Sequence, residues 1–503
     1  MKAKILTAAI LLVTSTASAQ TTQLQNKNFK PRVIVTTDPE LDDNNSLIRY
    51  LLFSSDFQTE GLIYASSKFH WKGDGHGTRQ FIKDSEYDKA GLGPQTSWRW
   101  DPAERFIDAD VDAYELCYPN LVRHDPDYPT PAELRSKIRW GNVEFEGDYT
   151  TDSPGSDLIK RVILDDKPGP VFLQTWGGAS TVAAALRAIE DEYKGTAQWN
   201  VIQKKVNEKC VLCMSGDQDG SYPKYIAKAW PDIPKMGTSN FAPLVYNGQN
   251  MVQKEYTFYL QPKWVSENLR IGPFGSRQRV WGDGVQYVKG DIYDYFGFPN
   301  YTKEQLTKMG YRVWSALQPA GSFLAEGDTF CYLNLIDNGL RAFQDNTWGG
   351  WSGRYREIKP IKTTNGFQRF APDEAIPKDH FFPEIMDGLA ARFYWSVSPN
   401  YKDCNHYPVV DGPLVLTAKP GQTVNINATA SDPDGDKLSI KWWQFKVGTY
   451  NGDCNVADPT ALTTTFTVPA DAKKGQTIHL ILEVNDGGTP NLKRYLRTVV
   501  TVK

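Results

Sequence analysis

The chain has 503 residues, of which 40% are hydrophobic and 23% are charged, and its 56 Lys and Arg nearly balance its 59 Asp and Glu. This length exceeds what one hydrophobic core usually organises, so we expect two or three domains. The balanced charge excludes a disordered acidic protein and a basic nucleic-acid binder, and we expect no nucleic-acid partner.

The first 19 residues have the pattern of a secretory signal peptide. Lys2 and Lys4 precede an apolar run over 5–13, and the small residues Ala17-Ser18-Ala19 follow as an A-x-A cleavage site. We therefore expect residues 1–19 to be removed and the mature protein to be secreted or periplasmic. Because no later stretch approaches the roughly 20 apolar residues that cross a bilayer, we expect no membrane span.

From residue 31 to about 398, apolar strands alternate with helical segments. RVIVTT precedes SLIRYLLFSS, GPVFLQTW precedes TVAAALRAIEDEY, and CVLCMSG precedes YPKYIAKAW. This alternation predicts βαβ units, and so an α/β domain over 28–405 with a mainly parallel sheet flanked by helices. The short Thr- and Val-rich segments that follow predict an immunoglobulin-like β-sandwich over 406–503.

The six cysteines are too few to form a disulfide framework. Cys404 and Cys454 each lie in an Asp-Cys-Asn triplet, and the sequence leaves a disulfide between them and two free thiols equally open. Cys210 and Cys213 form a C-x-x-C in an apolar run with no second such pair. Two buried thiols on a strand are therefore favoured over a zinc or redox site.

Three aspartates follow the first strand, in the segment VIVTTDPELDDNN over 33–45. Asp38, Asp42 and Asp43 lie between a strand and a helix, at the edge where open α/β sheets bind ligands. Carboxylates this close repel one another unless a cation compensates them, and Ca²⁺ prefers such oxygen ligands. The cluster predicts a metal site; the alternative is that Asp42 or Asp43 caps the helix and its neighbours are solvated.

The motif D-P-x-x-D-D after a first strand resembles the aspartate signature of nucleoside hydrolases. The segments RVIVTTDPELDDNNSLIRYLLFS, ASSKFHWKGDGHG, HDPDYPTPAELR, QTWGGASTVAAAL and AEGDTF more closely resemble the secreted family of cellulose-binding proteins that carry a nucleoside-hydrolase-like domain. The similarity covers most of residues 30–400, and the tail resembles that family's C-terminal β-domain. It implies a nucleoside-hydrolase-like fold for the first domain.

The resemblance also implies roles for single residues. Asp38 and Asp43 match aspartates that coordinate Ca²⁺, and Asp328 matches a late aspartate that completes the metal shell. Asp38 further matches the group that accepts the proton of the attacking water, and Asp42 matches the one that holds a sugar hydroxyl. A backbone carbonyl, here of Thr175 or Trp176, would add one more Ca²⁺ ligand.

Three positions depart from the nucleoside-hydrolase pattern. Thr36 replaces an Asp, Glu40 replaces a Gly, and Ser66 or Ser67 stands where an Asn would hold the sugar. These changes affect the expected ribose contacts and leave the predicted Ca²⁺ ligands in place.

Attack by water on a glycosidic bond needs a separate acid for the leaving group. The predicted candidates are His76 and Glu326, with Asp74, Asp217 and Asp219 as further carboxyl groups. Asp42 and the two serines are not the only groups predicted to bind substrate. Trp71 is a further candidate because aromatic rings bind the faces of sugars. Asp217 and Asp219 are candidates because they follow a strand at the same edge of the sheet.

Two features mark the C-terminal segment. Residues 431–436, SDPDGD, predict an acidic turn, for which a plain turn is favoured over a Ca²⁺ site. Trp442 and Trp443 are neighbours on a strand and so point to opposite faces, which places one of them in the core. We expect a structural module packed on the first domain.

These observations lead to two main hypotheses. The first is a secreted Ca²⁺-dependent hydrolase of N- or O-glycosidic bonds in carbohydrate, pentofuranosides included, with a water activated by Asp38. The second is a non-catalytic carbohydrate-binding or cellulose-binding protein on a nucleoside-hydrolase fold. A true nucleosidase is a third hypothesis, and the sequence leaves open whether the protein is a homo-oligomer.

Overall fold

The computed structural model describes residues 29–236, 243–345, 347–363, 366–373 and 380–503. The predicted signal peptide lies outside these ranges. Within them, no helix combines the length and the hydropathy that crossing a membrane would require.

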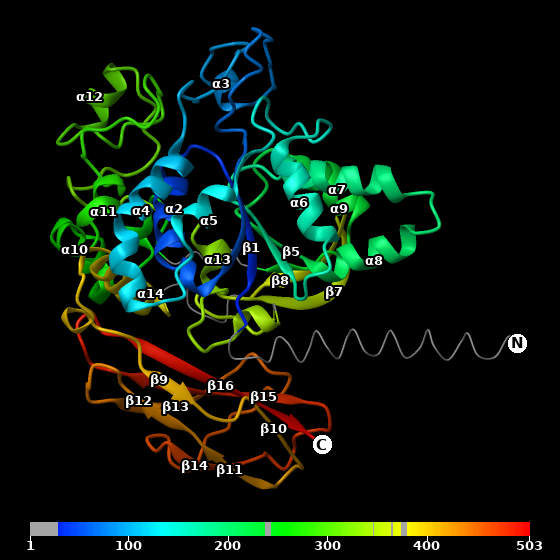
Figure 1. Cartoon of the computed structure of the whole chain (residues 1–503), viewed down its shortest axis with the longest axis vertical. Helices are drawn as coiled ribbons and strands as arrows, with labels where there is room; N and C mark the ends of the chain where they lie inside the picture. The colour runs from blue at the N-terminus through cyan, green and yellow to red at the C-terminus, as the bar shows by residue number, and fades with distance from the viewer. Residues whose placement is uncertain (1–28, 237–242, 346, 364–365, 374–379) are drawn as a thin grey trace, which may run out of the picture.

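The first domain is built on a six-stranded sheet in which all neighbouring strands are parallel (Figure 1). Its order is β3-β2-β1-β4-β5-β6, so β1 lies in the middle and the chain winds outward in both directions. The strands are β1 (Arg32–Thr37), β2 (Gln58–Tyr64), β3 (Ile138–Trp140), β4 (Val171–Thr175), β5 (Cys210–Met214) and β6 (Lys235–Met236). The predicted parallel sheet is confirmed.

Helices cover both faces of the sheet because alternate strand residues are apolar on both sides. Val33 and Val35 of β1 face one layer of helices, which consists of α2 (Leu41–Leu52), α4 (Phe106–His124) and α14 (Phe382–Val397). Ile34 of β1 faces the other layer, which consists of α6 (Pro154–Leu164), α7 (Ser180–Tyr193) and α8 (Trp199–Lys209). The predicted α/β fold is thereby confirmed.

Shorter elements complete the first domain. The helices are α3 (Glu86–Lys89), α5 (Pro131–Ser136), α9 (Ala227–Ala229), α10 (Pro262–Asn268), α11 (Gly272–Arg277), α12 (Lys303–Lys308) and α13 (Phe330–Leu333), and the strands β7 (Tyr355–Thr363) and β8 (Gly366–Pro372) form a hairpin.

The C-terminal domain consists of strands gathered beneath the first domain (Figure 1). They are β9 (Val409–Asp411), β10 (Val415–Ala418), β11 (Thr423–Asn427), β12 (Thr429–Ser431), β13 (Ser439–Phe445), β14 (Thr463–Thr467), β15 (Thr477–Asn485) and β16 (Lys493–Val502). The order β10-β16-β15-β13 makes a four-stranded sheet, and β11-β14 and β12-β9 make two antiparallel pairs. This strand-rich domain agrees with the predicted fold.

One face of the four-stranded sheet forms the core of this domain and the other packs on the first domain. Trp442 lies in the inner core, whereas Trp443 and Ile481 pack against the core of the first domain. Lys493 forms an ion pair with Glu384 of α14 at 2.5 Å. The two tryptophans therefore point to opposite faces as predicted, and Trp443 serves the contact between domains.

All six cysteines are free thiols. The disulfide between Cys404 and Cys454 is therefore absent, because Cys404 packs against the core of the first domain while Cys454 belongs to the core of the second. Cys210 and Cys213 are buried on β5 and face opposite sides of the sheet, since their spacing is odd. The prediction of buried thiols is confirmed.

Candidate functional site

The candidate site forms where β1 ends and α2 begins. Helix α2 has Glu40 as its N-terminal capping residue, without a side-chain hydrogen bond, and Asp42 and Asp43 lie in its first turn. Negative charge is favoured there by the helix dipole. The alternative in which Asp42 or Asp43 caps the helix is therefore wrong; instead Asp43 Oδ1 accepts a hydrogen bond from the Thr37 hydroxyl.

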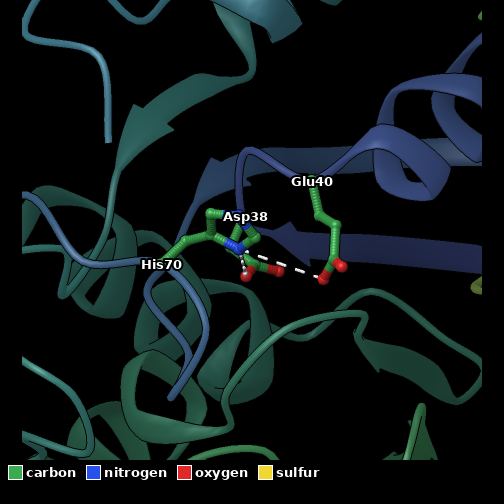
Figure 2. Close-up of side chains that lie close together, drawn as sticks. All are labelled: Asp38, Glu40 and His70. Carbon is green, nitrogen blue, oxygen red and sulfur yellow. Dashed lines mark hydrogen bonds and ion pairs between the residues drawn. The ribbon is translucent and has the colours of Figure 1, made fainter. Parts of the chain in front are cut away.

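Asp38 is fully buried at the centre of the site. Its Oδ2 accepts a hydrogen bond from the Ser67 hydroxyl at 2.6 Å, and His70 Nδ1 lies 3.1 Å from the same oxygen (Figure 2). Its Oδ1 is buried and has no hydrogen-bond partner among the residues that the structure describes. Gly177, after β4, allows this packing, because a Cβ there would lie 2.3 Å from Oδ1.

Glu40 links Asp38 to the aspartates of α2. One ligand atom each from Asp38, Glu40 and His70 lie within 4.8 Å of one another, and the same holds for Glu40, Asp42 and Asp43. Figure 2 shows Glu40 and His70 on either side of Asp38, with Glu40 Oε2 3.9 Å from His70 Nδ1. Asp328 belongs to neither group of three.

Asp328 nevertheless interacts with the same aspartates. Burial, and then the negative charges of Asp42 and Asp38, raise its pKa well above the usual value, while hydrogen bonds with Ser215 and Asp43 oppose the shift. Burial, followed by the charges of Asp328 and Asp38, likewise raises the pKa of Asp43 well above its usual value.

Asp42 lies at the edge of the cluster. Its Oδ1 accepts a hydrogen bond from the Tyr246 hydroxyl at 3.1 Å. Burial, which outweighs that bond, raises the pKa of Asp42 to about 6. Several carboxylates thus share a volume from which water is largely excluded.

Such a donor set fits a hard divalent cation. Buried carboxylates in mutual repulsion are compensated by a metal ion, and Ca²⁺ takes six to eight oxygen ligands. The Asp38 oxygen that lacks a hydrogen-bond donor is the atom that such an ion would satisfy.

Residues 32–355 match the family model for the nucleoside-hydrolase-like domain of the cellulose-binding protein Sde182. The chain belongs to this family. Residues 423–502 match the C-terminal domain of cellulose-binding protein Sde0182. The predicted resemblance is therefore confirmed.

A solved structure supports the same fold. It is described as a nucleoside hydrolase-related hypothetical protein from Saccharophagus degradans that is associated with carbohydrate metabolism. It is 22% identical to this chain, with a TM-score of 0.68, and the match covers 94% of this chain and all of the other. No curated protein matches the sequence significantly.

The two serines of this family member have different positions. Ser67 contacts Asp38 directly, so it orients the carboxylate. The Ser66 hydroxyl donates instead to the carbonyls of Asn142 and Phe145, which holds two loops together. The Thr36 hydroxyl, where nucleoside hydrolases have an Asp, donates to the Gln174 carbonyl and does not join the carboxylates.

The predicted carbonyl ligands each already accept one hydrogen bond. The Trp176 carbonyl accepts from Gln218 Nε2 at 2.6 Å, and the Thr175 carbonyl accepts from the Ser215 amide at 2.9 Å. Because a carbonyl oxygen has two lone pairs, the role of Trp176 or Thr175 as a cation ligand stays a prediction. The Trp176 ring itself packs in the core against Tyr50 and Tyr332.

Glu326 is predicted as a leaving-group acid, and this role stays a prediction. Its carboxylate is buried and forms an ion pair with Arg49 of α2, and it also accepts from Gln278 Nε2. Burial raises the pKa of Glu326, although the charge and hydrogen bond of Arg49 oppose the shift. Its acceptor sites are thus committed to the packing of the first domain.

His76 is exposed on a glycine-rich loop, where its amide donates to Asp74 Oδ1 at 2.8 Å. Its role as the acid stays a prediction. The histidine that contacts Asp38 is instead His70, six residues earlier in the same segment.

Asp217 and Asp219 differ in their surroundings. Asp219 is buried, and its carboxylate accepts from the Ser180 amide at the start of α7 and from the amide and hydroxyl of Ser221. Asp219 therefore stabilises the helix start, and its predicted contact with substrate stays a prediction. Asp217 is exposed at the turn, and its predicted contact with substrate stays open.

Trp71 was predicted to bind substrate, but its ring is fully buried. It packs with Tyr87 and Trp98 in a small separate core, so the ring has no surface to offer a sugar. The predicted exposure of the Trp71 ring to a sugar therefore differs from its observed burial, because other aromatic rings enclose it.

Sequence reasoning missed two residues of the site, Glu40 and His70. Glu40 was treated as a departure from a glycine, although it stands between the aspartates of the D-P-x-x-D-D motif. His70 lies three residues after Ser67 in ASSKFHWKG, and its proximity to Asp38 depends on how the β2 loop folds back.

Proposed function

We propose that this protein is a secreted, Ca²⁺-dependent hydrolase of glycosidic bonds in carbohydrate. The observation that carries the proposal is Asp38 Oδ1, a buried carboxylate oxygen that lies near other buried carboxylates and has no hydrogen-bond donor within the described part of the chain. The family's description as cellulose-binding supports a carbohydrate as the ligand.

Asp38, Asp43 and Asp328 would hold the ion, with Glu40 as a further carboxylate at the solvent side. Bound Ca²⁺ would compensate their charge and supply coordination positions for sugar hydroxyls and a water. Burial, and then the charges of neighbouring carboxylates, raise the pKa values of Asp43 and Asp328, and a bound cation would offset both effects.

The chain's own residues then orient the reaction. Ser67 and His70 contact Asp38 Oδ2 and so fix the orientation of the carboxylate, and Asp38 would accept the proton of the attacking water. Tyr246 holds Asp42 Oδ1, and this carboxylate would accept a hydrogen bond from a sugar hydroxyl. Direct attack by water implies inversion at the anomeric carbon.

The proposal is tested with Asp38→Asn and, as a matched control, Asp217→Asn. Both aspartates follow strands at the same sheet edge, but Asp217 is exposed. After removal of metal by chelation, calorimetric titration with Ca²⁺ should show binding to wild type and to Asp217→Asn, and strong loss in Asp38→Asn. Release of reducing sugar from a glycoside and polysaccharide panel should likewise be lost in Asp38→Asn.

A non-catalytic carbohydrate-binding protein is the second candidate function. It is favoured by one observation, namely that Glu326, a predicted leaving-group acid, is committed to Arg49. Binding of carbohydrate without release of reducing sugar from the whole panel would establish it. Release of free base from inosine or uridine would indicate a nucleosidase instead.

A further inference from the structure

Tyr246, which contacts Asp42, belongs to a group of three aromatic rings. Tyr246, whose hydroxyl donates to Asp42, stacks on Phe296 with 5.0 Å between ring centroids. Trp314 stands nearly perpendicular to both rings, with its centroid 4.9 Å from that of Tyr246 and 5.6 Å from that of Phe296. Since it contacts both members of the stack, the indole lies at the side of the pair.

Trp314 differs from its neighbours in exposure. Phe296, Tyr295 and Trp281 in the same cluster are buried, whereas 49% of Trp314 is exposed. Leaving a large ring in water forgoes the stabilisation that its burial would give. The exposed ring is therefore a feature to explain.

The backbone holds this ring in place. The Ser315 amide donates to the Tyr295 hydroxyl at 2.6 Å, and the Ser315 hydroxyl donates to Asn247 Oδ1 at 2.8 Å. Tyr295 precedes Phe296 in the chain and Asn247 follows Tyr246, so both hydrogen-bond partners of Ser315 adjoin the two stacked rings. Trp314 is thus presented to solvent at a fixed position relative to Tyr246.

Solvent reaches two of the clustered carboxylates. Asp38, Asp43 and Asp328 are buried, whereas Glu40 and Asp42 are partly exposed. A ligand that approaches the carboxylates therefore arrives past Glu40 and Asp42. Because Tyr246 bonds Asp42 and contacts Trp314, this approach adjoins the indole.

We propose that Trp314 is a stacking platform for a sugar ring at the entrance to the Asp38 site, and that the ligand is a neutral oligosaccharide. The inference rests on the proposed function. Sugar rings present apolar C–H faces that pack on aromatic rings, and their hydroxyls bind carboxylates such as Asp42. A full tyrosine ring separates Asp42 from Trp314, so a ligand that contacts both extends beyond one sugar unit.

The test uses the full chain saturated with Ca²⁺ and cellohexaose as the probe, followed by calorimetry. Trp314→Ala should weaken cellohexaose binding about 3- to 10-fold, the range of one aromatic contact. Trp314→Tyr should restore most of the affinity because it keeps a ring. Trp140→Ala is the control, since Trp140 is 37% exposed at the end of β3 and stacks on Tyr64 instead.

Calcium affinity separates this inference from the proposed function. Trp314→Ala should leave Ca²⁺ binding unchanged, whereas Asp38→Asn should abolish it. Three results would overturn the platform while Ca²⁺ binding and turnover persist. They are equal cellohexaose affinity of Trp314→Ala and wild type, an equal loss of affinity in Trp140→Ala, and no cellohexaose binding by wild type.

A different result would support the platform and overturn the hydrolase. In it, only Trp314→Ala loses cellohexaose binding, and the protein neither binds Ca²⁺ nor releases sugar. Concentration-dependent dimerisation of wild type that Trp314→Ala abolishes, without an effect on cellohexaose, would assign the ring to a second copy and overturn the inference.

Discussion

His124 Nδ1 lies 2.9 Å from His406 Nε2, and this contact joins helix α4 of the first domain to the start of the C-terminal segment. His124 Nε2 donates to the Ser398 carbonyl at 2.9 Å. His406 reaches Asp434 of the acidic turn, which accepts from its amide at 2.7 Å and lies 3.1 Å from its Nδ1. A continuous series of polar contacts therefore runs from α4 to the turn that the sequence predicted at 431–436.

We expect Asp434→Ala to destabilise the protein by about 1–3 kcal/mol, because the His406 amide loses its acceptor. Urea unfolding, followed by tryptophan fluorescence, measures the change. Asp436→Ala, two residues further along the same exposed turn, is the control and should remain within about 0.5 kcal/mol of wild type. Equal stability of the two variants would show that the contact contributes nothing.

Glu326→Gln should destabilise the fold by about 3–5 kcal/mol, because it leaves the buried Arg49 guanidinium without a counter-charge. Glu255→Gln, at an exposed glutamate, should have almost no effect. The measurement is again the free energy of unfolding. A folded Glu326→Gln variant of normal stability that has lost turnover would instead return Glu326 to a catalytic role.

Acid should weaken the protein partly through Glu60. Burial alone would raise the pKa of Glu60, but the hydrogen bond and charge of Arg32, with Lys137 and Lys167, outweigh it and hold the pKa below the usual value. A glutamate with a lowered pKa in the folded state contributes stability above its unfolded pKa of about 4.3, and that stability is lost as pH falls through the folded value. The stability difference between wild type and Glu60→Gln should therefore be largest near neutral pH and shrink below about pH 4. Unfolding free energies measured at several pH values test this; a constant difference would contradict it.

Calcium should stabilise the folded protein by mass action. At a free concentration of 100 times the dissociation constant, the expected gain is about 2.7 kcal/mol, visible as a rise in Tm. Asp217→Asn should show the same rise and Asp38→Asn should show none. An equal rise in all three proteins would place the ion elsewhere in the chain.

Local pattern determined the fold class. The alternation of apolar strands with helical segments is set within short stretches, and it predicted the parallel sheet and the helices on both of its faces. The position of Asp38, Asp42 and Asp43 between β1 and α2 is equally local, which is why the cluster could be found from neighbouring residues alone.

Partners distant in the chain decided the rest. Glu326 became half of an ion pair because Arg49, 277 positions earlier, points at it, and Asp219 is occupied by the start of a helix 39 positions earlier. Cys404 and Cys454 have the same sequence neighbours but belong to different cores. The sequence by itself determined which groups carry charge and which strand they follow. Only the tertiary structure decided which of these charges already have a partner. The reason is that the hydrogen bonds and the burial of a side chain depend on residues that folding brings from elsewhere in the chain.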